Sequence, residues 1–410
     1  MGGSPVSETS ERHDHKRRQR TIAACFVAQN IGMGLAFGSF GPLLTANEAH
    51  FGVDRAQASF GMSALISALG IFSALLGGLM GKLPVRAMMM AGAILNGIGY
   101  AGLSLGADYG VAIAMFALIG AGTSLIAVLG PVTLATRWVA VGRGKVLSII
   151  NLPLVLFATP FLVALLLPAW GREAIYHGFA TASFALLLPL LLVSERPTES
   201  DSQAAAGRMA TPTIRFFRRG DFWLLALGIG ILAGIGTAYT VHAVPYAVSR
   251  DLSQAQAAGL LSLYAGAGIF GTLLFGWLSD KLGASMALVL AAFTQTIMWL
   301  LLVLAPTAIF PIIAAILGIV TVPLVTLHGA VLAALFGPAG VSKAMGYSYA
   351  IKLPFIFGVT PLIGWLFMLD GHYQPAFLGC AAALLAATLL FLVVVRWAKA
   401  RPVATASLNR

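Results

Sequence analysis

The most regular feature of this chain is a succession of long apolar segments separated by short polar ones. Twelve segments are long enough to cross a bilayer as helices, which takes about 20 apolar residues. They cover residues 21–45, 58–81, 87–106, 110–135, 146–168, 174–194, 222–249, 256–278, 284–306, 308–337, 344–369 and 374–396. The segments are continuously apolar and do not alternate with polar residues, so the pattern predicts spanning helices rather than barrel strands. The expected fold is an all-α membrane protein.

Composition agrees with this interpretation, since 59% of the 410 residues are hydrophobic and 10% are charged. The net charge of +11 is distributed unevenly: the Lys and Arg residues gather before the first segment and in every second loop. Only Arg55, Arg172 and Arg250 fall in loops on the other side, and Lys352 lies inside a segment. This asymmetry predicts that both termini are cytoplasmic. We expect a monomeric, multi-pass protein of a bacterial inner (plasma) membrane whose basic N-terminus faces lipid headgroups, not nucleic acid.

A polar, basic segment at 195–220 divides the apolar segments into two groups of six. The predicted organisation is an N-terminal tail, a first bundle, a linker, a second bundle and a C-terminal tail, at residues 1–20, 21–194, 195–220, 221–396 and 397–410. The halves share motifs in the same order, among them GMGLAF with GIGTAY, GIFSALLGG with GIFGTLLFG, and NLPLVLFATP with KLPFIFGVTP. Parallel repeats are typical of secondary transporters, whose substrate site lies between the halves near the bilayer midplane.

Twelve helices, a 6+6 parallel repeat and a basic central linker resemble the major facilitator superfamily over nearly the whole chain. Two stretches, 51–82 and 241–283, are similar to the branch of monocarboxylate transporters and oxalate–formate exchangers. The resemblance implies a transporter in which two bundles rock about a central site. The sequence carries no nucleophile–base pair, metal-ligand spacing or phosphate-binding loop, so we expect neither an enzyme nor a cofactor.

The resemblance also implies a conformational latch in the loop after the second helix of each half. The second half matches the superfamily pattern Gly-x-x-x-Asp-[Arg/Lys]-x-Gly at four residues: Gly276, Asp280, Lys281 and Gly283. The first half keeps the basic residues Lys82 and Arg86 but has no aspartate. Because this aspartate is missing, the resemblance does not decide whether the first half has a working latch.

Lys352 is the only charged residue of the apolar stretch 344–369. A charge inside a bilayer costs several kcal/mol unless it faces a protein interior or a water-filled path, so a lysine there indicates a negatively charged partner. Its ammonium could instead extend to the membrane surface, or make a structural hydrogen bond. Lys343 is nine residues away, about 13 Å of helix, which is further than one side chain comfortably reaches. Lys352 resembles the helix-11 lysine that contacts the substrate carboxylate in oxalate–formate exchangers.

The acidic residues point the same way, because all 14 lie in loops, tails or helix ends. Cation-binding cavities and carboxylate proton relays normally need a buried Asp or Glu, so a lone buried cation favours an anionic substrate. The exchangers also carry an arginine on helix 8, and the alignment places that position at Thr272. One charge instead of two favours a monoanion, with specificity from shape and neutral hydrogen bonds.

Asn151 is the repeat mate of Lys352, since both open an X-Leu-Pro turn. Its amide suits a carboxylate or hydroxyl group, and interhelical hydrogen bonding is an equally good explanation. The prolines of these turns, Pro153 and Pro354, predict a bending point in each half.

The remaining candidates are weaker. His242 and His328 are the mid-membrane histidines and could line the cavity or carry a coupled proton, although most single helix histidines are packing residues. Asn30, Phe37 and Tyr239 lie on helices that line such cavities, and aromatic side chains there form apolar walls.

The leading hypothesis is a secondary transporter of small organic anions, most simply a monocarboxylate, coupled to proton symport or anion exchange. Lys352 would neutralise the carboxylate, and Asn151, Tyr239 and His242 would complete the site. One alternative is an exporter of larger neutral or amphipathic compounds. A non-transporting sensor is a third class, for which the linker offers little room.

Overall fold

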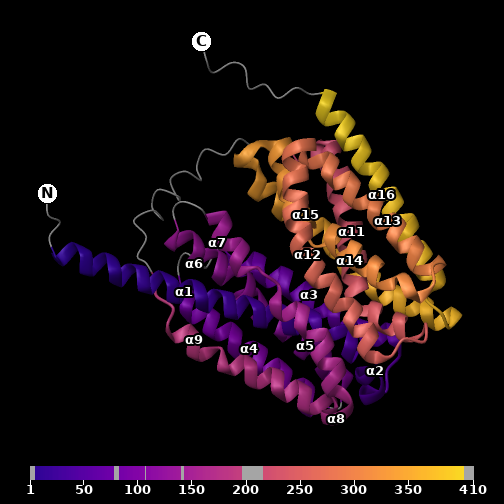
Figure 1. Cartoon of the computed structure of the whole chain (residues 1–410), viewed down its shortest axis with the longest axis horizontal. Helices are drawn as coiled ribbons and strands as arrows, with labels where there is room; N and C mark the ends of the chain where they lie inside the picture. The colour runs from indigo at the N-terminus through magenta and orange to yellow at the C-terminus, as the bar shows by residue number, and fades with distance from the viewer. Residues whose placement is uncertain (1–4, 78–82, 107, 140–142, 196–215, 401–410) are drawn as a thin grey trace. The chain divides into compact units, whose positions relative to one another are not determined.

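The computed structural model describes residues 5–77, 83–106, 108–139, 143–195 and 216–400. Its contacts divide the chain into two compact units. Unit 1 comprises residues 1–209 and 240–262, and unit 2 comprises residues 210–239 and 263–410. Every regular element in the described ranges is a helix (Figure 1).

The first half of the chain forms helices α1 (Pro5–Gly38), α2 (Phe40–Phe51), α3 (Arg55–Gly77), α4 (Val85–Leu105), α5 (Tyr109–Thr123), the π-helix η1 (Ser124–Leu129), α6 (Gly130–Trp138), α7 (Arg143–Ile150), α8 (Leu154–Ala185) and α9 (Leu187–Leu191). The second half forms the 3₁₀ turn η3 (Phe216–Arg218), α11 (Gly220–Val248), α12 (Gln254–Leu282), α13 (Ala284–Leu304), the 3₁₀ turn η4 (Thr307–Ile309), α14 (Phe310–Thr321), α15 (Leu324–Asp370) and α16 (Gln374–Ala400). In unit 2, α13 and α16 run side by side (Figure 1).

Eleven helical runs in the described ranges are long and apolar enough to cross a membrane. The difference from the twelve predicted spans comes from α8 and α9, which form one run from Leu154 to Leu191. Gly171 interrupts α8 with φ 73° and ψ 167°, a backbone conformation that residues with a Cβ rarely adopt. The predicted fifth and sixth spans therefore meet at Gly171, and the structure is consistent with the twelve-helix 6+6 architecture.

The helix α15 contains a reversal of the chain. A straight helix of its 47 residues would be about 70 Å long and would separate His328 from Ser348 by about 30 Å. The Ser348 hydroxyl and His328 Nε2 are 2.9 Å apart. The chain must turn between these residues, so α15 carries the end of the predicted tenth span and the whole of the eleventh.

The two predicted hinges differ in the structure. Helix α7 ends at Ile150 and α8 begins at Leu154, and Pro153 between them has a non-helical ψ of 53°. Pro354 lies inside the helical course of α15. The backbone is therefore broken at the proline of the first half and not at that of the second.

Glycine allows helices of each unit to pack closely, as expected for the repeated Gly-x-Gly motifs. A Cβ on Gly34 of α1 would lie 2.6 Å from the Cβ of Val155 on α8. A Cβ on Gly234 of α11 would lie 2.7 Å from the carbonyl oxygen of Phe355 on α15. Small residues at membrane helix interfaces permit this approach of the backbones.

We expect the Gly234→Val substitution to destabilise the protein. The new side chain would meet backbone atoms that cannot move aside, and overpacking of this kind costs about 1–3 kcal/mol. Thermal unfolding in detergent measures the effect. Gly379→Ala on α16 is the control, because a Cβ there meets nothing within 4 Å; equal melting temperatures of the two variants would contradict the packing assignment.

Candidate functional site

Lys352 lies on α15 in unit 2 and is only 7% exposed. Its ammonium nitrogen is 3.2 Å from the ring centroid of Tyr349, which precedes it by three residues on the same helix. Within the described ranges, no carboxylate lies at ion-pair distance from this ammonium. The charge that the sequence places in an apolar stretch is therefore buried in the protein and rests on an aromatic face.

His328 and Ser348 complete a small group around Lys352. Both are buried, and the His328 ring centroid is 6.3 Å from that of Tyr349. We call Lys352, Tyr349, Ser348 and His328 the lysine cluster. The structure thus brings together two predicted residues, Lys352 and His328, and adds two that the sequence analysis missed. The spacing could have revealed Tyr349, because residues i and i−3 share a helix face.

The other substrate-site candidates of unit 2 have partners of their own. Tyr239 is 4% exposed, and its ring packs 4.8 Å from Tyr264 and 6.1 Å from Trp299. The Thr272 hydroxyl donates a hydrogen bond of 3.0 Å to the Gly268 carbonyl of its own helix. Tyr239 therefore lies in an aromatic core, and the Thr272 hydroxyl is hydrogen-bonded to the backbone of its own helix, α12.

The candidates in unit 1 are dispersed. Asn30 donates to the Phe26 carbonyl at 3.1 Å and accepts the Val155 backbone N–H at 3.2 Å, so it satisfies an N–H group in the first turn of α8. Asn151 is exposed, and its amide donates to the Leu147 carbonyl at 2.8 Å. His242 on α11 is fully buried, and Phe37 on α1 is half-buried.

The latch residues of the second half lie where α12 gives way to α13. Lys281 extends over the Trp277 ring, 4.6 Å from its centroid, and Asp280 is exposed. Gly276, earlier on α12, has nothing within 4 Å of a Cβ built on it. Gly283 has φ 84°, a conformation for which glycine is the natural residue. The last glycine of the pattern thus allows the turn between the two helices.

In the first half, Lys82 lies outside the described residues. Arg86 contributes its backbone N–H, which donates to Glu195 Oε1 at 2.9 Å, while its side chain is exposed. Glu195 also pairs with Arg137 at 3.6 Å. Glu195, four residues after the end of α9, thus places a carboxylate beside the described part of the first-half loop, and the sequence analysis missed it.

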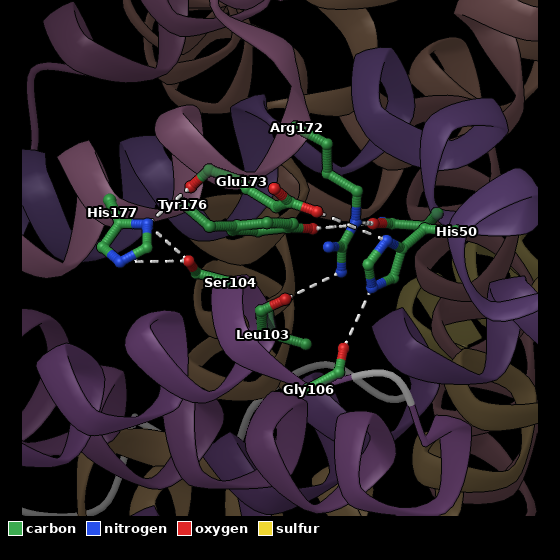
Figure 2. A network of polar contacts seen from close by, with 9 residues as sticks. His50, Leu103, Ser104, Gly106, Arg172, Glu173, Tyr176 and His177 are labelled. Atoms are coloured by element: carbon green, nitrogen blue, oxygen red, sulfur yellow. Dashed lines mark hydrogen bonds and ion pairs between the residues drawn. The ribbon is translucent and has the colours of Figure 1, made fainter.

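Arg172 corrects one expectation of the sequence analysis. The apolar pattern predicts a loop position for Arg172 and makes Lys352 the lone buried cation, yet Arg172 is also only 7% exposed. Its Nε donates to Asn47 Oδ1 at 2.7 Å. Its Nη2 donates to the Leu103 carbonyl at 2.9 Å (Figure 2). The guanidinium carbon lies 4.6 Å from the Phe51 ring centroid and 4.8 Å from that of Tyr176.

Two helix ends explain how this guanidinium is stabilised. Asn47 and Phe51 belong to the last turns of α2, and Leu103 belongs to the last turn of α4. Helix C-termini carry unpaired carbonyl groups and a partial negative charge, which favour a nearby cation. His50 and Gly106 extend the network with a contact of 3.0 Å between His50 Nε2 and the Gly106 carbonyl (Figure 2). Arg172 is therefore held by one side-chain oxygen, one backbone carbonyl and two aromatic rings, although its Nη1 has no hydrogen-bond partner among the described residues.

The comparisons with known proteins agree with this architecture. The family model of the Major Facilitator Superfamily matches residues 26–310 and 227–409. The chain belongs to the Major Facilitator Superfamily. Membership confirms the predicted fold class, a multi-pass all-α membrane protein, and points to a transporter rather than an enzyme.

Curated relatives match part of this superfamily member. Monocarboxylate transporter 12 of Mus musculus is 30% identical over 183 residues, which is 43% of this chain and 37% of the mouse protein. Monocarboxylate transporter 12 of Homo sapiens is 28% identical over 181 residues, 43% of this chain and 35% of the human protein. The matches thus cover little more than a third of each relative, and they support the predicted resemblance to this branch at low identity.

Solved superfamily structures share the fold. The nucleoside transporter NupG superposes with a TM-score of 0.74 and 11% identity, covering 93% of this chain and 99% of its own. The D-xylose-proton symporter superposes with a TM-score of 0.71 and 18% identity, covering 93% and 98%. At these identities the likeness extends to the fold alone.

We expect Arg172→Met to lower the stability of the protein. The substitution removes the donor to the Leu103 carbonyl and one of the two donors to Asn47 Oδ1, which keeps the Tyr176 hydroxyl at 3.2 Å. An unsatisfied buried group costs about 1–3 kcal/mol. The melting temperature in detergent should fall clearly. Glu173→Gln is the control, because that side chain is 66% exposed and exposed charges contribute little; similar melting temperatures for both variants would argue against the helix-end role.

Proposed function

We propose that this protein is a secondary transporter of small organic anions, most simply monocarboxylates. The observation that carries the proposal is the Lys352 ammonium, which is buried beside an aromatic face. An aromatic ring attracts a cation by about 0.5–2 kcal/mol but does not neutralise it. A carboxylate on a substrate supplies the missing negative charge.

The distribution of buried acids supports an anionic substrate over a cationic one. Asp221 at the start of α11 is 2% exposed, and its Oδ1 accepts hydrogen bonds of 3.0 Å from Arg219 Nε and from the Phe222 backbone N–H. A carboxylate that is already paired with a guanidinium is a poor site for a second cation. The charge of Asp221 is thus already balanced by Arg219, so this buried acid does not favour a cationic substrate.

Arg172 does not compete for this role. Its donors Nε and Nη2 already bind Asn47 and Leu103, and two aromatic rings cover it. Its Nη1 has no exposed surface to offer a ligand. Lys352 is thus the one buried cation in the described part of the chain that is left for a ligand, which favours a monoanion. The name of the curated relatives, monocarboxylate transporter 12, points to the same class.

Transport follows the alternating access expected of the fold, with the termini on the cytoplasmic side of a bacterial inner membrane. Lys352 holds the carboxylate, and His328 faces the same aromatic ring and contributes a polar edge. Substrate contacts by Asn151, Asn30 and Phe37 in the first half of the chain, and by His242 on α11, stay predictions from the sequence. Proton symport and anion exchange are both compatible with this site.

A second candidate is transport of neutral compounds. The aligned position of the helix-8 arginine is Thr272, whose hydroxyl is bound to its own helix. The nucleoside and D-xylose transporters named above share the fold. A neutral cargo would make no use of the Lys352 charge, so substitution of the lysine separates the two candidates.

We expect Lys352→Ala to reduce uptake of labelled monocarboxylates into proteoliposomes at least tenfold. Loss of the ammonium removes the charge-assisted contact with the carboxylate, whereas Lys352→Arg retains the charge and should retain part of the activity. Lys16→Ala, at an exposed lysine of α1, is the control. Unaltered carboxylate uptake by a folded Lys352→Ala protein would refute the proposal.

Ligand-induced stabilisation gives an independent comparison of the two candidates. Binding stabilises the folded state in proportion to the logarithm of ligand concentration over Kd. We therefore expect propionate, pyruvate and lactate to raise the melting temperature of the wild-type protein more than the matched amides do. A larger rise with the amides, nucleosides or sugars would favour the neutral-cargo candidate.

A further inference from the structure

We infer that Tyr349 is a positioning residue for the Lys352 ammonium, and that substrate binds to the side of the ammonium that the ring leaves free. This inference rests on the proposed function and specifies how the charge is presented. It concerns a residue that the sequence analysis did not select.

The geometry identifies Tyr349 as the partner that fixes the lysine. The 3.2 Å distance from the ammonium nitrogen to the ring centroid places the charge directly on the ring face. A lysine side chain has four rotatable carbons and otherwise samples many positions. Contact with a ring one helical turn away restricts it to the few rotamers that keep the ammonium at this point.

The ring also suits the presentation of a charge better than a carboxylate would. An ammonium group has three N–H donors, and one aromatic face occupies one side of it. The remaining donors keep their full attraction for a carboxylate. A protein carboxylate at the same distance would neutralise the charge and would have to be displaced by the substrate.

The ring is itself held in place and lies at the edge of the lysine cluster. Tyr349 is 37% exposed, whereas Lys352 is 7% exposed, so the tyrosine covers its neighbour. The His328 ring centroid lies 6.3 Å from that of Tyr349, and the two rings are tilted by 37°. His328 is fixed by its 2.9 Å contact with the Ser348 hydroxyl. Three successive contacts thus connect the buried Ser348 hydroxyl to the ammonium: Ser348 with His328, His328 with Tyr349, and Tyr349 with Lys352.

Two substitutions separate the ring from the rest of the side chain. Tyr349→Phe keeps the aromatic face, so its KM for a monocarboxylate should stay within about twofold of wild type. Tyr349→Leu removes the face, and we expect a KM about tenfold higher with kcat nearly unchanged, in line with the strength of cation–π contacts. Tyr347→Leu is the matched control, since Tyr347 lies two residues away, is 42% exposed and contacts Phe217 instead.

A second measurement does not depend on transport. Acetylation of Lys352 by acetic anhydride, quantified by mass spectrometry, reports how firmly the ammonium is held. We expect severalfold faster labelling of Lys352 in the Tyr349→Leu protein than in wild type, Tyr349→Phe and Tyr347→Leu. Equal labelling in all four proteins, or a Tyr349→Leu variant whose KM is unchanged or lower, would overturn the inference.

The two measurements also distinguish this inference from the proposed function. If wild-type protein transports no carboxylate while Tyr349→Leu still accelerates labelling, the proposed function fails and the positioning role stands. If carboxylate transport depends on Lys352 while neither KM nor labelling responds to Tyr349, the proposed function stands and the positioning role fails. A fall in kcat and in melting temperature without a rise in KM would indicate a structural role only, and would also refute the inference.

Discussion

A cation removed from water needs another source of negative potential, and this requirement organises both units of the protein. In unit 1 the guanidinium of Arg172 donates to the Asn47 side-chain oxygen near the C-terminal end of α2 and to the Leu103 backbone carbonyl in the last turn of α4. In unit 2 the ammonium of Lys352 meets the face of Tyr349. The helix ends provide hydrogen-bond acceptors, whereas the ring provides only an electrostatic attraction. The two buried cations are therefore in different chemical situations.

Because their partners differ, the two buried cations have different roles, one in the packing of helices and the other in the proposed binding of substrate. A guanidinium with hydrogen bonds to two helix ends links those ends together, and its contribution is to the packing of the bundle. An ammonium that rests on a ring retains most of its attraction for an anion. The same chemical rule thus assigns Arg172 to the framework and leaves Lys352 as the charge that we propose a substrate meets. Superfamily membership then places such a charge in a protein that moves solutes across a membrane.

Much of the fold could be predicted because bilayer-spanning helices must satisfy their own backbone hydrogen bonds, so that hydropathy reveals them directly. The limits of that approach are visible at three places. The helical run through Gly171 joins two predicted spans, α15 contains a reversal that only the contact between His328 and Ser348 reveals, and Pro354 does not interrupt its helix. Hydropathy averages over a segment, so it records neither the backbone conformation of a single residue nor a contact between residues 20 positions apart.

The sequence by itself determined the class of protein, the number of spans, the internal repeat and the presence of a charge in an apolar segment. All of these follow from composition and order, which are local properties. The tertiary structure decided which side chains surround that charge, and it buried Arg172, which a linear reading places in a loop. It also supplied Glu195 as the carboxylate near the first-half loop. Burial and partnership depend on which helices pack together, and that arrangement is decided by the contacts of the whole unit rather than by any one segment.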